Sequence, residues 1–362
     1  TDLVPGNYAI VQLQKSGWNQ TVPAPAAGDD FAFVVNTTAD TVDVTPGDFF
    51  ALDSNGKTSL RAAIMEANQS SAPIAIQVPA GSYTLSLSGT VENDAATGDL
   101  DIHRNITLVG AGADLTIIDA DGKSRHFDVQ STGNLTLRNL ALTNGTQPGG
   151  FTDNTGGAIW NRWGATLNVD HTLVAGSQAG EAGAISNEGT ATVTHSTLTG
   201  NTGTIAAGAL LNSGTLTVQS STIHGNHAGD FGALRNTGGT TTLDTVTISG
   251  NTASGNGGAI GNENFGAPAQ LVILDSTITA NTASGSGTVA GAIQATSDGS
   301  VRIARSIIAE NTGTADLVGT YVSDGDNLVG NAGSASGFTH DVKGDLVGSS
   351  SNPIDPRLAA LA

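Results

Sequence analysis

Residues 156–161 read GGAIWN, and this phrase sets the pattern of the chain. Shorter copies return at a regular interval: GAISN at 183–187, GALLN at 208–212, GALRN at 232–236, GAIGN at 258–262 and, less closely, GAIQA at 291–295. The alanines of successive copies are 24 to 33 residues apart. Self-similarity at a period of about 20 to 50 residues is typical of solenoids and propellers.

A second phrase keeps step with the first. It is a short Thr- and Ile-rich run that closes on Asn: STLTGN, STIHGN, VTISGN, STITAN and SIIAEN, ending at Asn201, Asn226, Asn251, Asn281 and Asn311. Three positions before each Asn stands an aliphatic residue, and in the first four copies polar residues flank it. This alternation is typical of a half-buried strand. Asn and Gly tolerate the left-handed backbone of a sharp corner, and stacked Asn side chains can form a ladder.

These repeats are too short for a propeller. Each holds two or three runs of about four to six strand-forming residues, too few for a four-stranded blade with its loops. We therefore predict an all-β fold, a right-handed parallel β-helix in which each repeat forms one coil. Neighbouring coils should lie about 4.8 Å apart. The repeated Ala, Ile and Asn are then core and corner residues and not catalytic groups.

The composition agrees with this prediction. Of 362 residues, 12% are charged and 4% aromatic, and 49 are Gly, which suits stacked strands and turns. Without Cys the chain forms no disulfide and offers no thiol chemistry. No long apolar run is present, so we expect no membrane insertion. The formal net charge of −19 argues against nucleic acid and anionic membrane surfaces as partners.

Residues 1–30 do not fit the repeat, whereas residues 31–362 form the predicted β-helix domain. We interpret 1–30 as the remnant of a preceding β-sandwich-type module or a linker, with an edge strand along the coil as the alternative. A helix is predicted near 59–68, where Thr58 or Ser59 can cap a run of periodic apolar residues. We assign this helix to cover the open N-terminal end of the coil.

The segment TSLRAAIMEAN (58–68) resembles the CSLREAI-type motif at the start of many secreted bacterial β-helix proteins. The closing region DNLVGNAGSASGFTHDVKGDLVGSSSNPIDPRLAALA (326–362) is also similar to that family, so the resemblance covers about residues 31–362. Thr58 departs from the motif, because the family has Cys there, and packing must hold a loop that a disulfide otherwise ties. The resemblance implies a right-handed parallel β-helix, an extracellular or cell-surface location, and a role in attachment or polymorphic outer-membrane-type display.

From these features we expect a structural or adhesive module of a larger exported bacterial surface protein. Its ranks of Thr, Ser and Asn would meet a carbohydrate, a cell surface or another subunit. Trp160, Trp163, Phe231 and Arg235 form the predicted contact patch, with end packing as the alternative for the two Trp residues. Residues 1–30 could also add as a strand to the next subunit, which would give head-to-tail filaments.

The alternative function is a polysaccharide-acting enzyme, a glycoside hydrolase or a lyase, because such enzymes also use parallel β-helices. Glu181 and Asp230 stand at equivalent positions two coils apart, so strand spacing puts them about 9.6 Å apart. That separation is near the upper limit for an inverting carboxylate pair. His171 and His195 share another column and supply the kind of base that a lyase needs. The simpler interpretation of both His residues is that they are polar faces of neighbouring strands.

Two acidic clusters flank the repeats. Asp94, Asp99 and Asp101 lie in ENDAATGDLDI (92–102), and Asp324 and Asp326 lie in SDGDN (323–327). Closely spaced carboxylates suit Ca²⁺, although neither segment matches an EF-hand loop or the nonapeptide calcium repeat. Asp is also a common turn residue. Calcium is therefore the one candidate cofactor, and turn formation is the simpler interpretation.

Overall fold

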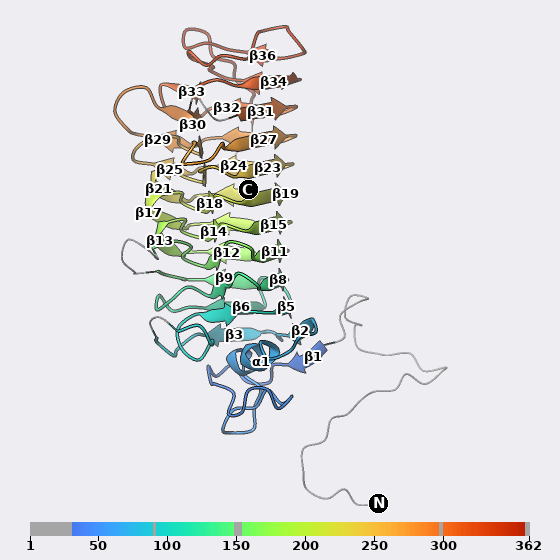
Figure 1. Cartoon of the computed structure of the whole chain (residues 1–362). Coiled ribbons are helices and arrows are strands. Elements are labelled where there is room, and N and C mark those ends of the chain that lie inside the picture. Colours follow the sequence, from blue (N-terminus) through green and yellow to red (C-terminus); the bar gives the residue numbers. More distant parts are fainter. Residues whose placement is uncertain (1–30, 90–91, 148–153, 297–299, 359–362) are drawn as a thin grey trace, which may run out of the picture. The chain divides into compact units, whose positions relative to one another are not determined.

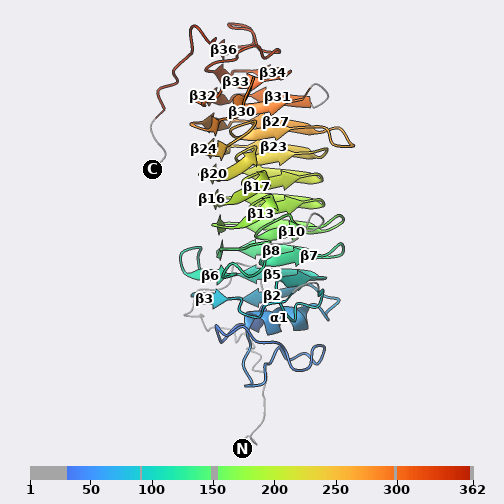
Figure 2. The ribbon, with the colours of Figure 1, turned by 90° about the vertical axis from the view of Figure 1, so that its left-hand side faces the viewer.

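The computed structural model describes residues 31–358 except 90–91, 148–153 and 297–299. The interpretation of residues 1–30, and the filament prediction that depends on it, lie outside these residues. In the described part, successive repeats lie one above the next as coils (Figures 1 and 2). Every pairing between the named strands is parallel, and the domain is a right-handed parallel β-helix, as predicted. No helix among these described residues has the length and apolarity needed to cross a membrane.

Sheet A is one of two long ladders of strands. It holds eleven strands: β1 (Phe31–Val34), β2 (Ile74–Gln77), β5 (Asn105–Val109), β8 (Asn134–Arg138), β11 (Thr166–Asp170), β15 (Thr190–Thr194), β19 (Thr215–Gln219), β23 (Thr240–Asp244), β27 (Gln270–Leu274), β31 (Ser300–Ala304) and β34 (Val322–Gly325). From β8 to β31 all five residues of each strand pair with their counterparts without a register shift. Equivalent side chains of successive coils therefore line up in columns.

Sheet B also holds eleven strands: β3 (Gly81–Thr84), β6 (Thr116–Asp119), β9 (Ala141–Thr143), β12 (Leu173–Ala175), β16 (Thr197–Thr199), β20 (Thr222–His224), β24 (Thr247–Ser249), β28 (Thr277–Thr279), β32 (Ile307–Ala309), β35 (Leu328–Val329) and β36 (Leu346–Val347). Its central aliphatic column is the one that precedes the repeated Asn by three positions. These side chains are fully buried: Leu198, Ile223, Ile248, Ile278 and Ile308.

Sheet C holds nine strands, and the six from β10 to β30 coincide with the six copies of the GA phrase. The nine are β4 (Leu100–Ile102), β7 (Phe127–Val129), β10 (Ile159–Asn161), β14 (Ile185–Asn187), β18 (Leu210–Asn212), β22 (Leu234–Asn236), β26 (Ile260–Asn262), β30 (Ala290–Ala295) and β33 (Ala315–Val318). A smaller sheet D links sheets B and C in five coils through β13 (Gln178–Glu181), β17 (Thr202–Ala206), β21 (His227–Asp230), β25 (Thr252–Ala253) and β29 (Thr282–Ala283).

The GA phrase recurs because the coils approach closely there. A side-chain carbon on Gly208 would collide with the carbonyl oxygen of Gly232 in the next coil, and the same conflict repeats at its equivalents Gly157, Gly183, Gly232 and Gly258. Only Gly fits such a contact. The Ala that follows is fully buried in all six copies, so the prediction that these residues form the core is confirmed.

Two ladders of buried Asn side chains run along the stack. The first joins Asn161, Asn187, Asn212, Asn236 and Asn262, each Nδ2 donating to the next Oδ1 at 2.7–3.0 Å. The second joins Asn201, Asn226, Asn251, Asn281 and Asn311 at 2.9–3.0 Å. In the second ladder each Asn backbone N–H also donates to the following Oδ1. Most polar groups at these corners are therefore paired within the chain, whereas the buried Asn161 Oδ1, at the first step of the first ladder, accepts no hydrogen bond from the described residues.

Helix α1 (Leu60–Ala67) forms the N-terminal cap at the blue end of the stack (Figure 2). Ser59 caps it by accepting a hydrogen bond from the Ala62 N–H at 2.9 Å. Arg61 is fully buried; it donates to Asp40 at 2.6 and 3.2 Å and to the carbonyl oxygens of Ala95 and Gly98. The predicted cap helix is confirmed.

The loop that precedes Thr58 is held by backbone and side-chain hydrogen bonds. Thr58 exchanges two of them with Asn36, one from each backbone N–H, both at 2.9 Å. Asp53 accepts bonds from the N–H groups of Asn55 and Lys57 and from the Thr41 hydroxyl. These bonds hold the loop in a chain that has no Cys.

Candidate functional site

The predicted carboxylate pair is present as a column. Glu181 pairs with Ala206 and Ala206 pairs with Asp230, in adjacent strands of sheet D. Both carboxylates, however, are engaged within the stack. Glu181 accepts from Arg235 at 3.3 Å, and Asp230 accepts from the Asn256 N–H at 2.6 Å, closing the loop of the next coil. Their contacts are those of structural residues.

The predicted aromatic patch is corrected by the structure. Trp160 is 7% exposed and Phe231 is 3% exposed, whereas Trp163 is 78% exposed. Trp160 lies between two guanidinium groups, that of Arg162 at 3.7 Å and that of Arg125 at 5.0 Å from its ring centre. Phe231 packs over Gly261 of the next coil, where a side chain would collide with it. Burial therefore removes two of the three rings from the surface.

Arg235, the charged member of that patch, links its own coil to two others. Its guanidinium contacts Glu181 at 3.3 Å and Glu263 at 2.9 Å and lies 5.8 Å from the Phe231 ring centre. It thus serves as a bridge over the buried ring.

A buried carboxylate cluster lies on the outer face of sheet C. Asp101, Asp128 and Trp160 are the middle residues of β4, β7 and β10 and pair in register. Asp101 is 1% and Asp128 5% exposed. Asp128 accepts two hydrogen bonds from Arg162, both at 2.7 Å, and Arg125 lies 3.4 Å from both Asp128 and Asp99. Arg125 thus bridges the carboxylates of Asp99 and Asp128, and Arg162 adds a second guanidinium group to Asp128.

Burial raises the pKa of two carboxyl groups in and beside this cluster, those of Asp99 and Asp101. It raises the pKa of Asp99 to about 6, against the opposing effect of Arg125. It raises the pKa of Asp101 to about 8, and the negative charge of Asp99 adds to the increase. Carboxylic acids that stay protonated near neutral pH are typical of functional sites, although structural clusters also produce them.

The calcium candidates have other contacts in the structure. Asp101 accepts hydrogen bonds from Gln130 at 3.0 Å and from the Ala95 N–H at 3.2 Å. The backbone N–H of Asp94 donates to Glu92, which forms a turn. Asp324 accepts two bonds from Arg302, at 3.1 and 2.7 Å, and Asp326 lies in a left-handed turn with φ of 59°. Calcium binding at these residues stays a prediction.

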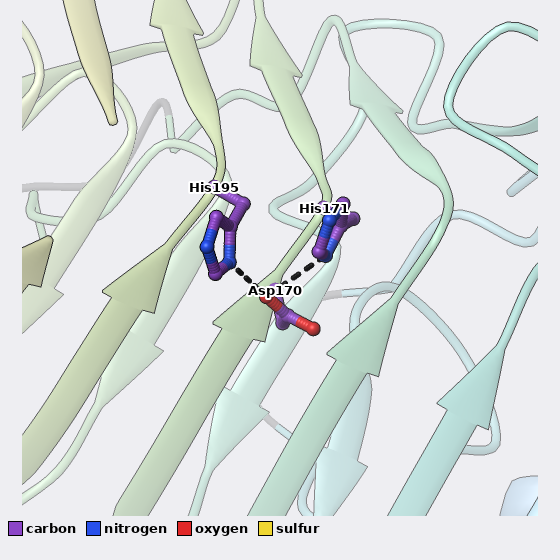
Figure 3. A group of neighbouring side chains, drawn as sticks. All are labelled: Asp170, His171 and His195. Atoms are coloured by element: carbon purple, nitrogen blue, oxygen red, sulfur yellow. Dashed lines mark hydrogen bonds and ion pairs between the residues drawn. The ribbon is translucent and has the colours of Figure 1, made fainter. Parts of the chain in front are cut away.

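The His column brings together a third residue that the sequence analysis did not include (Figure 3). Asp170, the last residue of β11, has its Oδ1 atom 3.0 Å from Nδ1 of His171 and 3.0 Å from Nδ1 of His195. The Thr194 hydroxyl donates to the same oxygen at 2.8 Å. The two imidazole rings are stacked, with centres 4.6 Å apart. One possible metal-ligand atom from each of the three side chains lies within 4.8 Å of the other two. Among the described residues, this is the group of His, Asp or Glu side chains that meets this condition.

The surroundings of this His–Asp cluster are open. His171 and His195 line a surface cavity of about 490 Å³ together with Ala113, Asp114, Asn139, Thr172, Leu173 and Thr197. Burial raises the pKa of Asp170, but the hydrogen bonds from His195, His171 and Thr194 outweigh it and leave that pKa below its usual value. The cluster therefore presents an ionised carboxylate and two imidazoles to a space that a small ligand can enter.

Comparison with known proteins assigns neither a family nor an activity to the chain. No protein-family model matches the chain, and no curated protein matches it in sequence. A solved structure that aligns with it is the Azotobacter vinelandii mannuronan C-5 epimerase AlgE6 A-module, with 14% sequence identity, a TM-score of 0.31, and coverage of 80% of this chain and 83% of that one. At this distance the likeness does not extend to an activity.

Proposed function

We propose that the β-helix domain is a rigid structural module of a larger exported bacterial surface protein, where it sets the distance at which other parts are displayed or attach. The observation that carries this proposal is the unbroken register of sheet A from β8 to β31. Because every residue of each strand pairs with its counterpart, the length of the stack grows by one strand spacing, about 4.8 Å, with each coil.

Stiffness follows from the buried ladders. Bending the stack would separate coils on one side. Each step of a ladder there is a hydrogen bond between two side-chain amides that are closed off from water. Such a bond contributes about 1 kcal/mol when formed, and a buried group left without a partner costs about 1–3 kcal/mol. Two parallel ladders and three main sheets resist bending in all directions.

The outer faces supply the contact surface of this proposal. Thr residues repeat along the outer side of sheet A, as at Thr190, Thr215 and Thr240, all exposed. Trp163, in the turn between β10 and β11, is also exposed. Hydroxyl groups and an exposed indole are suitable partners for a carbohydrate or a cell-surface ligand. The proposed location is extracellular or at the cell surface.

The spacing function can be tested on a membrane. The domain is anchored by its C-terminal end to a supported lipid bilayer and labelled near the cap helix, at an introduced Cys replacing the exposed Asp48. Energy transfer to a dye in the bilayer reports the height of the label. Duplication of residues 215–239, one whole coil, should raise that height by about 4.8 Å per copy.

An equally long Gly/Ser insertion at the same point is the matched control, because a flexible Gly/Ser segment supplies no strand to pair with the neighbouring coils and should loop out without adding a strand spacing. A height that does not depend on coil number, or that follows the behaviour of the Gly/Ser control, would contradict the spacer function.

A polysaccharide-acting enzyme is the second candidate function, and the carboxylate cluster of Asp99, Asp101 and Asp128 is the observation that favours it. A carboxyl group with a pKa of about 6 or 8 is able to donate a proton near neutral pH. Substrate would have to displace the side chains that now cover Asp101 and Asp128, which is why we place the rigid module first.

This second candidate is tested by incubating the chain with neutral and acidic polysaccharides and measuring new reducing ends or unsaturated uronates. Activity lost in Asp101→Asn would assign chemistry to the carboxylate cluster. Activity lost instead in the double variant Glu181→Gln with Asp230→Asn would assign it to the predicted pair, and a wholly inert chain would rule against both.

A further inference from the structure

We propose that Asp170, His171 and His195 bind one divalent transition-metal ion on the surface of the stack. The three ligand atoms come from two consecutive coils: Asp170 and His171 from the end of β11, and His195 from the turn after β15. They are Oδ1 of Asp170 and the Nδ1 atoms of the two imidazoles, and all lie within 4.8 Å of one another (Figure 3).

The separations fit a single ion. Zinc binds imidazole nitrogen at about 2.0–2.1 Å and carboxylate oxygen at about 2.0–2.2 Å, so two ligand atoms of one ion lie roughly 2.9 Å apart at a right angle and 3.4 Å apart at the tetrahedral angle. Each Nδ1 atom is 3.0 Å from the Asp170 oxygen. The carboxylate–imidazole separations therefore already match those around a metal. The two Nδ1 atoms lie within 4.8 Å of each other, and rotation of the exposed imidazoles brings them to the spacing of two ligands of one ion.

The fold holds the two imidazoles in the same orientation. His171 and His195 occupy equivalent left-handed turn positions, each with φ of 47°. Their backbone N–H groups donate to carbonyl oxygens of the following coil, those of Thr194 and Gln219, both at 3.2 Å. Identical turns direct the rings to the same side, and their planes differ by 23°.

A neighbouring hydroxyl fixes the carboxylate. The Thr194 hydroxyl donates to Asp170 Oδ1 at 2.8 Å, the kind of outer contact that orients ligands in protein metal sites. The site is therefore built by the stacking of the coils and does not depend on a flexible loop.

The ligand set selects the class of ion. Two imidazoles and one carboxylate suit Zn²⁺, Ni²⁺, Cu²⁺ and Fe²⁺, whereas Ca²⁺ and Mg²⁺ prefer oxygen ligands alone. The side chains of His171 and His195 are 57% and 54% exposed, and they face the cavity that Asp114 also lines. Three protein ligands leave at least one coordination position open to this cavity, as in sites that bind a further small ligand.

The test is isothermal titration of the untagged chain with Zn²⁺. We expect one ion per chain. His171→Ser and His195→Ser should each weaken binding by at least about tenfold, since even outer partners of metal ligands contribute that much. Ser is chosen because Ser220 occupies the equivalent turn of the next coil with the same φ of 47°. His227→Ala is the matched control, because His227 is exposed and bonds to Thr252 outside the cluster.

Loading with Cu²⁺ gives a second, independent result. Electron paramagnetic resonance should show coupling to two imidazole nitrogens, reduced to one in either Ser variant. Excess Ca²⁺ should not displace the ion. Absence of stoichiometric Zn²⁺ binding, or equal binding by the wild type and both Ser variants, would overturn the proposal.

Discussion

Removing one amide from the middle of the second Asn ladder should destabilise the whole domain. In Asn226→Ala, Oδ1 no longer accepts from the backbone and side-chain nitrogens of Asn201, at 2.9 and 3.0 Å. Nδ2 no longer donates to Asn251 or to the carbonyl oxygens of Leu198 and His224, at 2.9–3.1 Å. The side chain is 1% exposed, so water does not replace these partners.

The size of the effect follows from that count. Five hydrogen bonds share one oxygen and one nitrogen, so we count two polar groups and not five independent bonds. With about 1–1.5 kcal/mol for each group and about 1 kcal/mol for the Asn201 N–H that loses its acceptor, the free energy of unfolding should fall by about 3–4 kcal/mol.

The assay is urea unfolding followed by circular dichroism and Trp fluorescence, compared at equal m-value. Gln219→Ala is the control from the same coil, because Gln219 is exposed, and it should change stability by no more than about 0.5 kcal/mol. Asn226→Ala variants that lose less than about 1 kcal/mol would refute the view that the ladders hold the coils together.

Three further substitutions test other parts of the account. Arg61→Ala removes the partner of Asp40, whose side chain is 2% exposed, so thermal and urea unfolding should show a loss of about 3–5 kcal/mol; a loss under 1 kcal/mol would mean that the cap does not depend on this pair. Gly208→Ala places a carbon against the Gly232 carbonyl and should lower stability by about 1–3 kcal/mol, whereas the exposed Thr215→Ala should not. Because burial raises the folded-state pKa of Asp101 to about 8, above an unfolded value of about 3.9, the unfolded chain loses this proton first as pH rises. The free energy of unfolding should therefore fall between about pH 4 and pH 8, and Asp101→Asn should flatten that profile; an unchanged slope would show that Asp101 is already ionised at neutral pH.

The repeats carried most of the fold prediction. The copies of the GA phrase and the closing Asn are counted directly from the sequence, and stacking in register makes equal positions neighbours in space. For the same reason the column of Glu181, Ala206 and Asp230 could be predicted. The repeat period could not predict that the Asp230 carboxylate accepts a hydrogen bond from the loop of the next coil, because the length of that loop varies between coils.

The sequence analysis identified only some members of the two clusters of titratable groups. Asp128 was missed as a neighbour of Asp101 because β4 and β7 precede the first GA phrase, so no repeat sets their register. Asp170 was missed beside His171 because adjacent residues of a strand point to opposite faces. The left-handed turn at His171 breaks that rule and returns the ring to the carboxylate.

Burial of Trp160 also escaped the sequence analysis. Its ring is covered by Arg125, which comes from the preceding coil, and by Arg162, two residues further along the chain. Neither contact is signalled by the repeat, since neither Arg belongs to a repeated position. The repeat period alone therefore predicts which equivalent residues line up in successive coils. Contacts made by side chains at unrepeated positions are seen only in the three-dimensional structure.

The stacking itself is measured most directly by the distance between spin labels on sheet A. The chain has no Cys, so Thr190→Cys with Ser300→Cys introduces two unique labels, and four strand steps separate these residues. Electron spin resonance should give a distance of about 19 Å, rising to about 24 Å when residues 215–239 are duplicated once. An unchanged or broadly scattered distance after duplication would show that the added repeat does not join the stack as a coil, and the account would fail with it.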